Sequence, residues 1–399
     1  MRVLLYCRSF FPALGGLESV TLSLAQRIAG AGHWCAVVTE TTETSAIGGD
    51  HRSGGPFPFD VHRAPTQRQR LALVKSADIV HSNGASLALF FHAQLLRKPF
   101  LWTHAGYQMV SVDGLGWVDG RPAPLTPLAS LRLHARTRGL RAAGVAALKL
   151  GIRRAAGRVV DRNVAVSRWV ARRQPLPRQV VIYNPFSLAP FKQARPVAAS
   201  ACYDFLYVGR LVGEKGVGTL LRALALLNEE RARGRRAPAS LLIVGDGAER
   251  AALEQLTAFL ELGAQVHFAG RKQGQELVET MRQATVAVVP SEWEEAMGGV
   301  ALELLAAGLP LIVSERGGLS ECAGDAAWTF PNGDHRALAA RMAAVADDEI
   351  LRRSKANAAP RVLAAFDEQA LAQCYLDLYA EILAERAHRG RLCQPSARG

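Results

Sequence analysis

The chain has 399 residues, which suits two domains of ordinary size, and its composition of 49% apolar and 21% charged residues argues against a disordered chain. Its six cysteines form no Cys-x-x-Cys pair and no Cys/His cluster, which argues against a disulfide framework and a zinc site. The formal net charge is +13, but the segment from Gly120 to Tyr203 holds sixteen Lys or Arg residues and one acid, so one region of the chain calls for an anionic partner.

The first half of the chain alternates strand-like and helix-like segments. We predict strands at residues 2–6, 33–39, 77–81 and 99–103 and an amphipathic helix at 17–31. Strands that alternate with helices in this way build a parallel sheet through right-handed crossovers. Gly15 and Gly16 fall between the first strand and its helix, where backbone amides can bind phosphate; an ordinary strand-to-helix turn is the simpler interpretation.

The second half repeats this alternation. We predict strands at 204–208, 240–244, 265–268, 286–289 and 310–313 and helices at 217–227, 249–262, 275–282 and 299–307. The predicted fold class is therefore α/β, with two Rossmann-like doubly wound domains that face a central cleft. We expect domains at 1–185 and 200–367, a proline-containing linker at 186–199, and a last helix at 368–385 that packs back on the first domain.

The stretch Gly209-Arg210-Leu211, followed by Glu214-Lys215-Gly216, comes directly after a predicted strand. Ligands of open α/β sheets bind beyond the carboxyl ends of the strands. Two cations at this edge suit a diphosphate, because Arg offers a planar fork of donors and Lys a mobile point charge. The alternative interpretation is a pair of solvated surface cations.

A second loop, Ser291–Gly308, also follows a predicted strand and reads SEWEEAMGGVALELLAAG. Glu295 and Glu303 are separated by seven residues, and two glycines precede the helix that carries Glu303. Amides at such a helix start can bind phosphate or a sugar hydroxyl, and a carboxylate in the first turns can accept two vicinal ribose hydroxyls. The alternative is a charged loop before an amphipathic helix, which is how we interpret Glu292 and Glu294.

The glycine pair after the first strand, the Gly-Arg-Leu-x-x-Glu-Lys-Gly stretch and the Glu-x7-Glu loop and helix form an ordered set. In this set the sequence resembles glycosyltransferase family 4, also called glycosyl transferases group 1, over most of the second half and the first strand-helix unit. The resemblance implies a GT-B fold and a retaining transferase that uses a nucleotide diphosphate sugar without a metal. After the first glutamate the family usually has Gly or Pro, then Phe and Gly; this chain has Ala296-Met297-Gly298, so the sugar preference does not carry over.

The resemblance also implies roles for single residues. Arg210 and Lys215 would hold the donor diphosphate, Glu303 the ribose and Glu295 the donor sugar. The implied catalytic set is Arg210, Lys215, Glu295 and His104. The implied donor-binding set is Gly15, Gly16, Gly245, Asp246, Gly270, Arg271, Met297, Gly298, Gly299, Val300 and Glu303.

His104 follows a predicted strand, and in the resembling family a histidine at such a strand end approaches the donor sugar. It could donate a hydrogen bond to a hydroxyl there, although a structural histidine is the alternative. His81 is a weaker rival, and Ser82 and Asn83 beside it could touch an acceptor. The sequence has no Asp-x-Asp and no Asp/His cluster with metal-ligand spacing, so we expect no metal; Asp347-Asp348-Glu349 is interpreted as a solvated helix face.

Residues 131–158 combine Leu, Val and Ile with eight Lys or Arg residues and no acid. A helix of this kind could lie on an anionic membrane, at about 1 kcal/mol for each basic residue near the surface. An insertion with a solvated basic face is an equal alternative. No aromatic-interleaved basic motif indicates nucleic acid binding, and no apolar run reaches the roughly 18 residues of a membrane span, so we expect a cytoplasmic protein with peripheral membrane contact under the first interpretation.

The expected reaction moves a sugar from a UDP- or GDP-sugar to a glycan or lipid-linked acceptor, as in bacterial surface polysaccharide or lipopolysaccharide synthesis. No cofactor is expected beside the donor. Two alternatives stay open. A nucleotide-sugar 2-epimerase shares the architecture but would need more acid/base residues, and a non-catalytic membrane-surface protein would bind the nucleotide sugar without turning it over.

Overall fold

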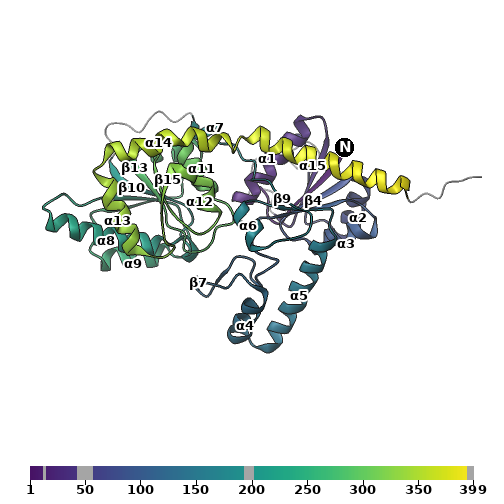
Figure 1. The fold of residues 1–399 in the computed structure, drawn as a ribbon, viewed down its shortest axis with the longest axis horizontal. Helices are drawn as coiled ribbons and strands as arrows, with labels where there is room; N and C mark the ends of the chain where they lie inside the picture. Colours follow the sequence, from purple (N-terminus) through teal and green to yellow (C-terminus); the bar gives the residue numbers. More distant parts are fainter. Residues whose placement is uncertain (12–14, 43–56, 193–201, 393–399) are drawn as a thin grey trace, which may run out of the picture. The chain divides into compact units, whose positions relative to one another are not determined.

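The computed structural model describes residues 1–11, 15–42, 57–192 and 202–392 (Figure 1). The chain divides into two compact units. The first contains Met1–Leu115, Pro124–Phe186 and the chain from Phe366 onward, and the second contains Gly116–Ala123 and Ser187–Ala365. The predicted linker at 186–199 falls partly outside the described residues, and its described part contains a short helix, α7 (Ala189–Lys192).

The first unit is built on one parallel sheet of seven strands. The strand order is β3-β2-β1-β4-β5-β8-β9, and every neighbouring pair is parallel. The strands are β1 (Arg2–Cys7), β2 (Trp34–Thr39), β3 (Asp60–Arg63), β4 (Ile79–Asn83), β5 (Phe100–His104), β8 (Arg162–Ala165) and β9 (Gln179–Val181). The helices are α1 (Gly16–Gly30), α2 (Gln67–Ser76), α3 (Leu87–Leu95), α4 (Pro127–Arg138), α5 (Leu140–Val159), α6 (Arg168–Arg173) and α15 (Glu368–Leu392).

Apolar side chains on both faces of this sheet explain why helices cover both sides. Val3 and Leu5 of β1 join a core with α1 and α15, whereas Leu4 and Tyr6 join the opposite core. Successive side chains of a strand point to opposite faces, so a continuous apolar run needs cover on both. The helix α15 supplies part of that cover, and it is longer than the helix predicted at 368–385.

The second unit repeats the plan with six parallel strands in the order β12-β11-β10-β13-β14-β15. The strands are β10 (Tyr203–Val208), β11 (Leu241–Val244), β12 (Val266–Gly270), β13 (Ala284–Val289), β14 (Leu311–Ser314) and β15 (Ala327–Phe330). The longer helices are α8 (Val217–Arg233), α9 (Arg250–Phe259), α10 (Gly274–Met281), α11 (Gly299–Ala306), α12 (Gly318–Ala323), α13 (His335–Ala346) and α14 (Glu349–Ala364). Two 3-10 turns are η1 (Gly213–Lys215) and η2 (Gly324–Ala326). The predicted α/β class with two Rossmann-like units is confirmed.

A short hairpin departs from the predicted division. The strands β6 (Trp117–Val118) and β7 (Arg121–Pro122) are antiparallel and lie within the first half of the sequence, yet they belong to the second unit. The indole of Trp117 lies beside Gly213, where an added Cβ would be 3.3 Å from the ring. The hairpin therefore packs on the turn η1, a contact that strand and helix periodicity did not predict.

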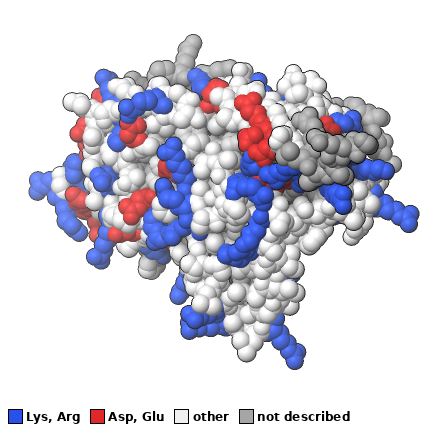
Figure 2. All heavy atoms as spheres, turned by 45° about the vertical axis from the view of Figure 1, so that its right-hand side comes forward, with Lys and Arg blue, Asp and Glu red and all other residues white. Residues whose placement is uncertain are grey.

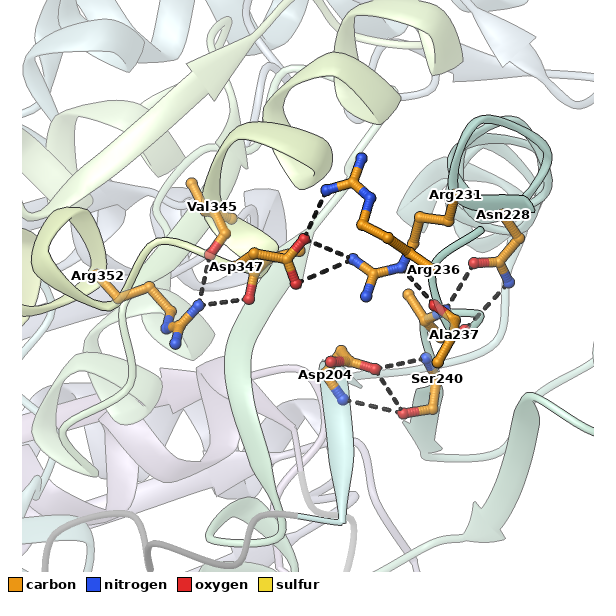
Figure 3. A network of polar contacts seen from close by, with 11 residues as sticks. Asp204, Asn228, Arg231, Arg236, Ala237, Ser240, Val345, Asp347 and Arg352 are labelled. Carbon is orange, nitrogen blue, oxygen red and sulfur yellow. Dashed lines mark hydrogen bonds and ion pairs between the residues drawn. The ribbon is translucent and has the colours of Figure 1, made fainter. Parts of the chain in front are cut away.

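Asp347 lies between α13 and α14 and ties this junction to α8. Its carboxylate accepts hydrogen bonds from Arg231 at 3.0 and 3.2 Å and from Arg236 at 2.9 Å (Figure 3). Arg231 is buried, so the ion pair compensates a cation that has lost water. Asp348 caps α14 through its side chain. Asp347, Asp348 and Glu349 are all exposed, as interpreted from sequence, but Asp347 and Asp348 also have structural partners.

Candidate functional site

Three loops at the carboxyl edge of the second sheet lie backbone against backbone. An added Cβ at Gly245 would be 1.8 Å from the carbonyl oxygen of Gly209, and φ of Gly245 is +146°. The amide of Leu211 donates to the Asp246 carbonyl at 3.0 Å, and the amide of Gly245 donates to the Gly270 carbonyl at 2.9 Å. Only glycine tolerates this approach. The structure thus brings together the predicted residues after β10, β11 and β12.

The turn η1 places Lys215 against the loop that follows β13. Gly216 has φ of +68°, and a Cβ there would be 2.0 Å from the Pro290 carbonyl oxygen, so the two loops are in direct contact. The amide of Glu292 donates to the Glu214 carbonyl at 3.0 Å. Because Gly216 admits no side chain, the backbone itself fixes where Lys215 projects.

Lys215 and Glu295 form an ion pair. The Nζ atom lies 2.8 Å from Oε1 of Glu295, and both side chains are largely buried. Ser291 donates its hydroxyl to the same Oε1 atom. The ammonium also lies 5.7 Å from the centre of the Trp293 ring, within reach of a cation–π contact. Two predicted catalytic residues are therefore brought together, although they are 80 residues apart in sequence.

Further polar side chains anchor the loop that carries Glu295. Thr219 donates to Glu292 at 2.6 Å, and Arg316 pairs with Glu294 at 2.6 Å. The amide nitrogen of Asn332 lies 3.1–3.2 Å from three loop carbonyl oxygens. Glu292 and Glu294 lie in a charged loop before α11, as interpreted from sequence, and both carboxylates have partners there. Thr219, Arg316 and Asn332 carried no sequence signal, because their partners lie far away along the chain.

Glu303 projects from α11, whose N-terminus begins at Gly298. A Cβ at Gly298 would be 2.8 Å from Cα of Leu319, so this start requires glycine. The Glu303 carboxylate has no hydrogen-bond or ion-pair partner within the described part of the chain. Burial raises its pKa to about 7, since a desolvated carboxylate without donors resists ionisation. Hydroxyl donors from a ligand would supply what the protein does not.

Other predicted donor-binding residues lie around these loops. Arg210 has a side chain that is 69% exposed, and its guanidinium lies 3.4 Å from Glu214. Arg271 is exposed directly after β12. Met297, Gly299 and Val300 lie at or near the start of α11 and are half-buried. The exposed Arg210 side chain can therefore turn toward an anion at the carboxyl edge of the sheet, whereas Lys215 is held by its ion pair.

His104 belongs to the first unit and ends β5. Its Nε2 atom lies 2.8 Å from Oδ1 of Asn163, whose amide nitrogen donates to the carbonyls of Gly157 and Pro177. The amide orientation makes Oδ1 the acceptor, so Nε2 carries the proton. Nδ1 is then an acceptor, and it has no partner among the described residues. Burial lowers the pKa of His104 to about 4, so the ring stays neutral. The free nitrogen accepts a hydrogen bond and does not donate one, which corrects the donor role expected from sequence.

His81, the rival histidine, is fully engaged in the core. Nδ1 lies 2.6 Å from the Tyr379 hydroxyl and Nε2 lies 2.7 Å from the Thr103 hydroxyl. Its burial lowers its pKa to about 3. Nδ1 attaches α15 to the sheet and Nε2 contacts the neighbouring strand β5, so His81 has no free ring nitrogen for a ligand.

Remaining predicted residues of the first unit lie at its sheet edge. Ser82 donates to the Gly84 carbonyl at 2.7 Å, and Asn83 donates to Thr21 at 2.9 Å. Gly16 begins α1 with open space around its Cα, and Gly15 precedes it as the cap residue. The loop before Gly15 includes residues outside the described ranges.

Neither a metal cluster nor a membrane span is found in the part of the chain that the structure describes. Within the described ranges, no three His, Cys, Asp or Glu side chains are grouped so that they could hold a metal ion. Among the described helices, none is both long and apolar enough to cross a bilayer.

Residues 193–362 match the family described as glycosyl transferases group 1. A glycogen synthase of Mycobacterium tuberculosis is 34% identical over 203 residues, and the chain spans about half of that relative, 47% of its length. A 2-deoxystreptamine N-acetyl-D-glucosaminyltransferase of Streptomyces fradiae is 29% identical over 385 residues, which cover 88% of each chain.

The fold has solved counterparts. The crystal structure of Anabaena Alr3699/HepE in complex with UDP and glucose has a TM-score of 0.70 and 17% identity, and the match covers 95% of this chain and 99% of that one. The two Rossmann-like units and this counterpart define a fold of the two-domain GT-B type, and the second unit carries the match to the glycosyl transferases group 1 family.

Proposed function

We propose that this chain is a retaining, metal-independent transferase that moves a sugar from a nucleotide diphosphate sugar to a hydroxyl of a glycan or lipid-linked acceptor. One observation carries the proposal. A buried Lys215–Glu295 ion pair and the unpartnered carboxylate of Glu303 belong to loops at one sheet edge, next to the N-terminus of α11. A cation, helix amides and a free carboxylate suit the diphosphate and the ribose of such a donor.

In this proposal the donor is held by the second unit. Glu303 accepts hydrogen bonds from the two ribose hydroxyls, and the amides at Gly298 and Gly299 bind the diphosphate. Lys215 and Arg210 balance its charge, while the backbone around Gly245 and Gly270 borders the base. The HepE structure contains UDP and glucose, so a UDP-sugar is the first donor to test, with a GDP-sugar second.

We propose a same-face transfer. The bond between the anomeric carbon and the phosphate oxygen breaks while the acceptor hydroxyl attacks from the side that the phosphate leaves. Lys215, Arg210 and the α11 amides stabilise the charge on the diphosphate, and a phosphate oxygen takes the proton of the acceptor. Glu295 is already paired with a cation, which suits positioning of a sugar hydroxyl better than nucleophilic attack. The free Nδ1 atom of His104 accepts a hydrogen bond from a hydroxyl of the sugar.

The acceptor class rests on the resemblance and on charge. The eight cations and absent acids of residues 131–158 suit an anionic lipid or an acceptor on a membrane surface. This favours bacterial surface polysaccharide or lipopolysaccharide synthesis, with the protein in the cytoplasm at the inner face of the membrane.

The test is nucleotide release from a panel of UDP-, GDP- and ADP-sugars, measured with and without EDTA. Slow release from one donor, abolished in Glu303→Ala and unaffected by EDTA, is the expected result. Loss of activity in EDTA that a divalent metal restores would contradict metal independence. If neither release nor calorimetric binding occurs with any donor or free nucleotide, the assignment of the site is wrong. Accumulation of an epimerised sugar without acceptor would favour the epimerase instead.

A further inference from the structure

The helices α4 and α5 form a hairpin that we call the basic hairpin, residues 127–159. It is two helices and not the single one considered from sequence, because Gly139 has φ of +88° and ends α4. The pair projects from the first unit at the lower end of Figure 1. It contains eight Lys or Arg residues and no acid.

The outward face of α5 exposes large aliphatic side chains. Leu140, Val145 and Leu148 are 82%, 56% and 65% exposed. The inward face instead carries Ala146 and Leu150, which are buried. A helix on a water-facing surface normally turns charged or polar residues outward. Large aliphatic side chains that are exposed on a packed helix indicate an interaction surface, which a second apolar environment covers.

Cations are interspersed with these aliphatic side chains. Arg141, Lys149 and Arg158 are exposed on the same helix, whereas Arg154 turns inward and donates to the Met109 carbonyl at 2.9 Å. In Figure 2 the lower end of the molecule shows Lys and Arg side chains and no Asp or Glu. The partner that binds this face must therefore be apolar inside and anionic at its surface.

We propose that the basic hairpin docks on an anionic lipid surface, with Leu140, Val145 and Leu148 entering the headgroup and acyl boundary. A helix of this composition lies in the membrane interface, and anionic lipids attract its cations. A second copy of the chain fits less well, because two acid-free basic faces would repel each other. Nucleic acid fits less well too, because residues 127–159 contain no Phe, Tyr or Trp for base stacking.

The test is co-sedimentation of the full chain with vesicles, one set of phosphatidylcholine alone and one mixed with phosphatidylglycerol. Docking does not depend on the proposed reaction, so no donor is added. The apolar variant is L140Q/L148Q and the charge variant is R141Q/K149Q/R158Q. Their matched controls are F259Q, an exposed aromatic side chain of the second unit, and R222Q/R233Q/R353Q, three exposed cations of that unit.

We expect binding to the mixed vesicles that is at least about tenfold weaker in both hairpin variants and unchanged in both controls. Binding of the wild type to phosphatidylcholine alone should be weak, and salt should weaken binding to the mixed vesicles. Thermal unfolding that matches the wild type shows that the variants fold. The proposal is overturned if the wild type ignores anionic vesicles, if neither hairpin variant weakens binding, or if the wild type is a dimer that L140Q/L148Q converts to a monomer.

Discussion

The carboxylate of Glu303 makes donor binding dependent on pH in the neutral range. Burial raises its pKa from 4.5 to about 7. In the protein without ligand, about one-tenth of this carboxylate is ionised at pH 6 and about nine-tenths at pH 8. Ribose hydroxyls donate to the ionised form. If only that form binds, affinity for the donor rises about tenfold between these pH values.

The variant Glu303→Gln should remove this dependence. Loss of two charge-assisted hydrogen bonds, each bond being worth roughly 1.5–3 kcal/mol before compensation, should cost about 2 kcal/mol at pH 8, or about 30-fold in affinity. At pH 6 the gap should narrow to about threefold, because the wild type has lost most of its ionised form. The assay is calorimetry with an intact nucleotide sugar, since the terminal phosphate of a free diphosphate titrates in the same range.

The same variant should fold better than the wild type. The folded pKa of Glu303 lies above its unfolded value, so the unfolded chain releases its proton first and stability falls as pH rises from 4.5 to about 7. Glu303→Gln should therefore be more stable above pH 7, by up to about 3 kcal/mol in urea unfolding. Weaker binding with higher stability separates a ligand-binding role from misfolding. A wild-type donor affinity that is flat from pH 6 to pH 8, or a variant that keeps the same slope, would refute the reasoning.

Three further changes test other parts of the site. Lys215→Met should leave Glu295 buried without its cation and raise the barrier by about 2–4 kcal/mol, seen as a fall in kcat; near-normal turnover would remove Lys215 from the mechanism. His104→Phe should lower kcat about tenfold, the value of one lost hydrogen bond, and unchanged turnover would make His104 purely structural. It should also remove the loss of stability, up to about 3 kcal/mol, that protonation of the unfolded histidine causes as pH falls from 6.5 to about 4. Gly216→Ala should destabilise the protein by at least about 2 kcal/mol in urea unfolding, whereas Gly263→Ala, at a position with open space, should be nearly neutral; equal effects would contradict the close loop contact.

Some of the site could be predicted because its residues are contiguous. The Gly209–Gly216 stretch and the Ser291–Gly308 loop each follow a strand, and the edge of a parallel sheet collects whatever follows its strands. Gly245 and Gly270, which the resemblance implied, have φ of +146° and +69°, a backbone conformation that favours glycine. Such signals are short-range, so the sequence displays them directly.

Other features depend on partners distant in sequence. The sequence neighbours of Glu292 and Glu294 indicate no partner for either carboxylate. In the folded chain Thr219 donates a hydrogen bond to Glu292, and Arg316 forms an ion pair with Glu294. Asp347 is likewise bound by Arg231 of α8 and by Arg236, which follows that helix. The charge of a residue is local information, whereas the identity of its partner is set when the elements pack.

The sequence by itself determined the two α/β units and the loops that bear the candidate site, because the alternation of apolar segments and the glycines at strand ends are local properties of the chain. Only the tertiary structure decided the state of its ionisable groups. Burial and the orientation of Asn163 make His104 a neutral acceptor, and burial without a partner raises the pKa of Glu303. Likewise, only packing decided that large apolar side chains of α5 face outward. The hydrophobicity of a residue predicts that it avoids water, but it does not predict whether the protein core or another apolar environment covers it.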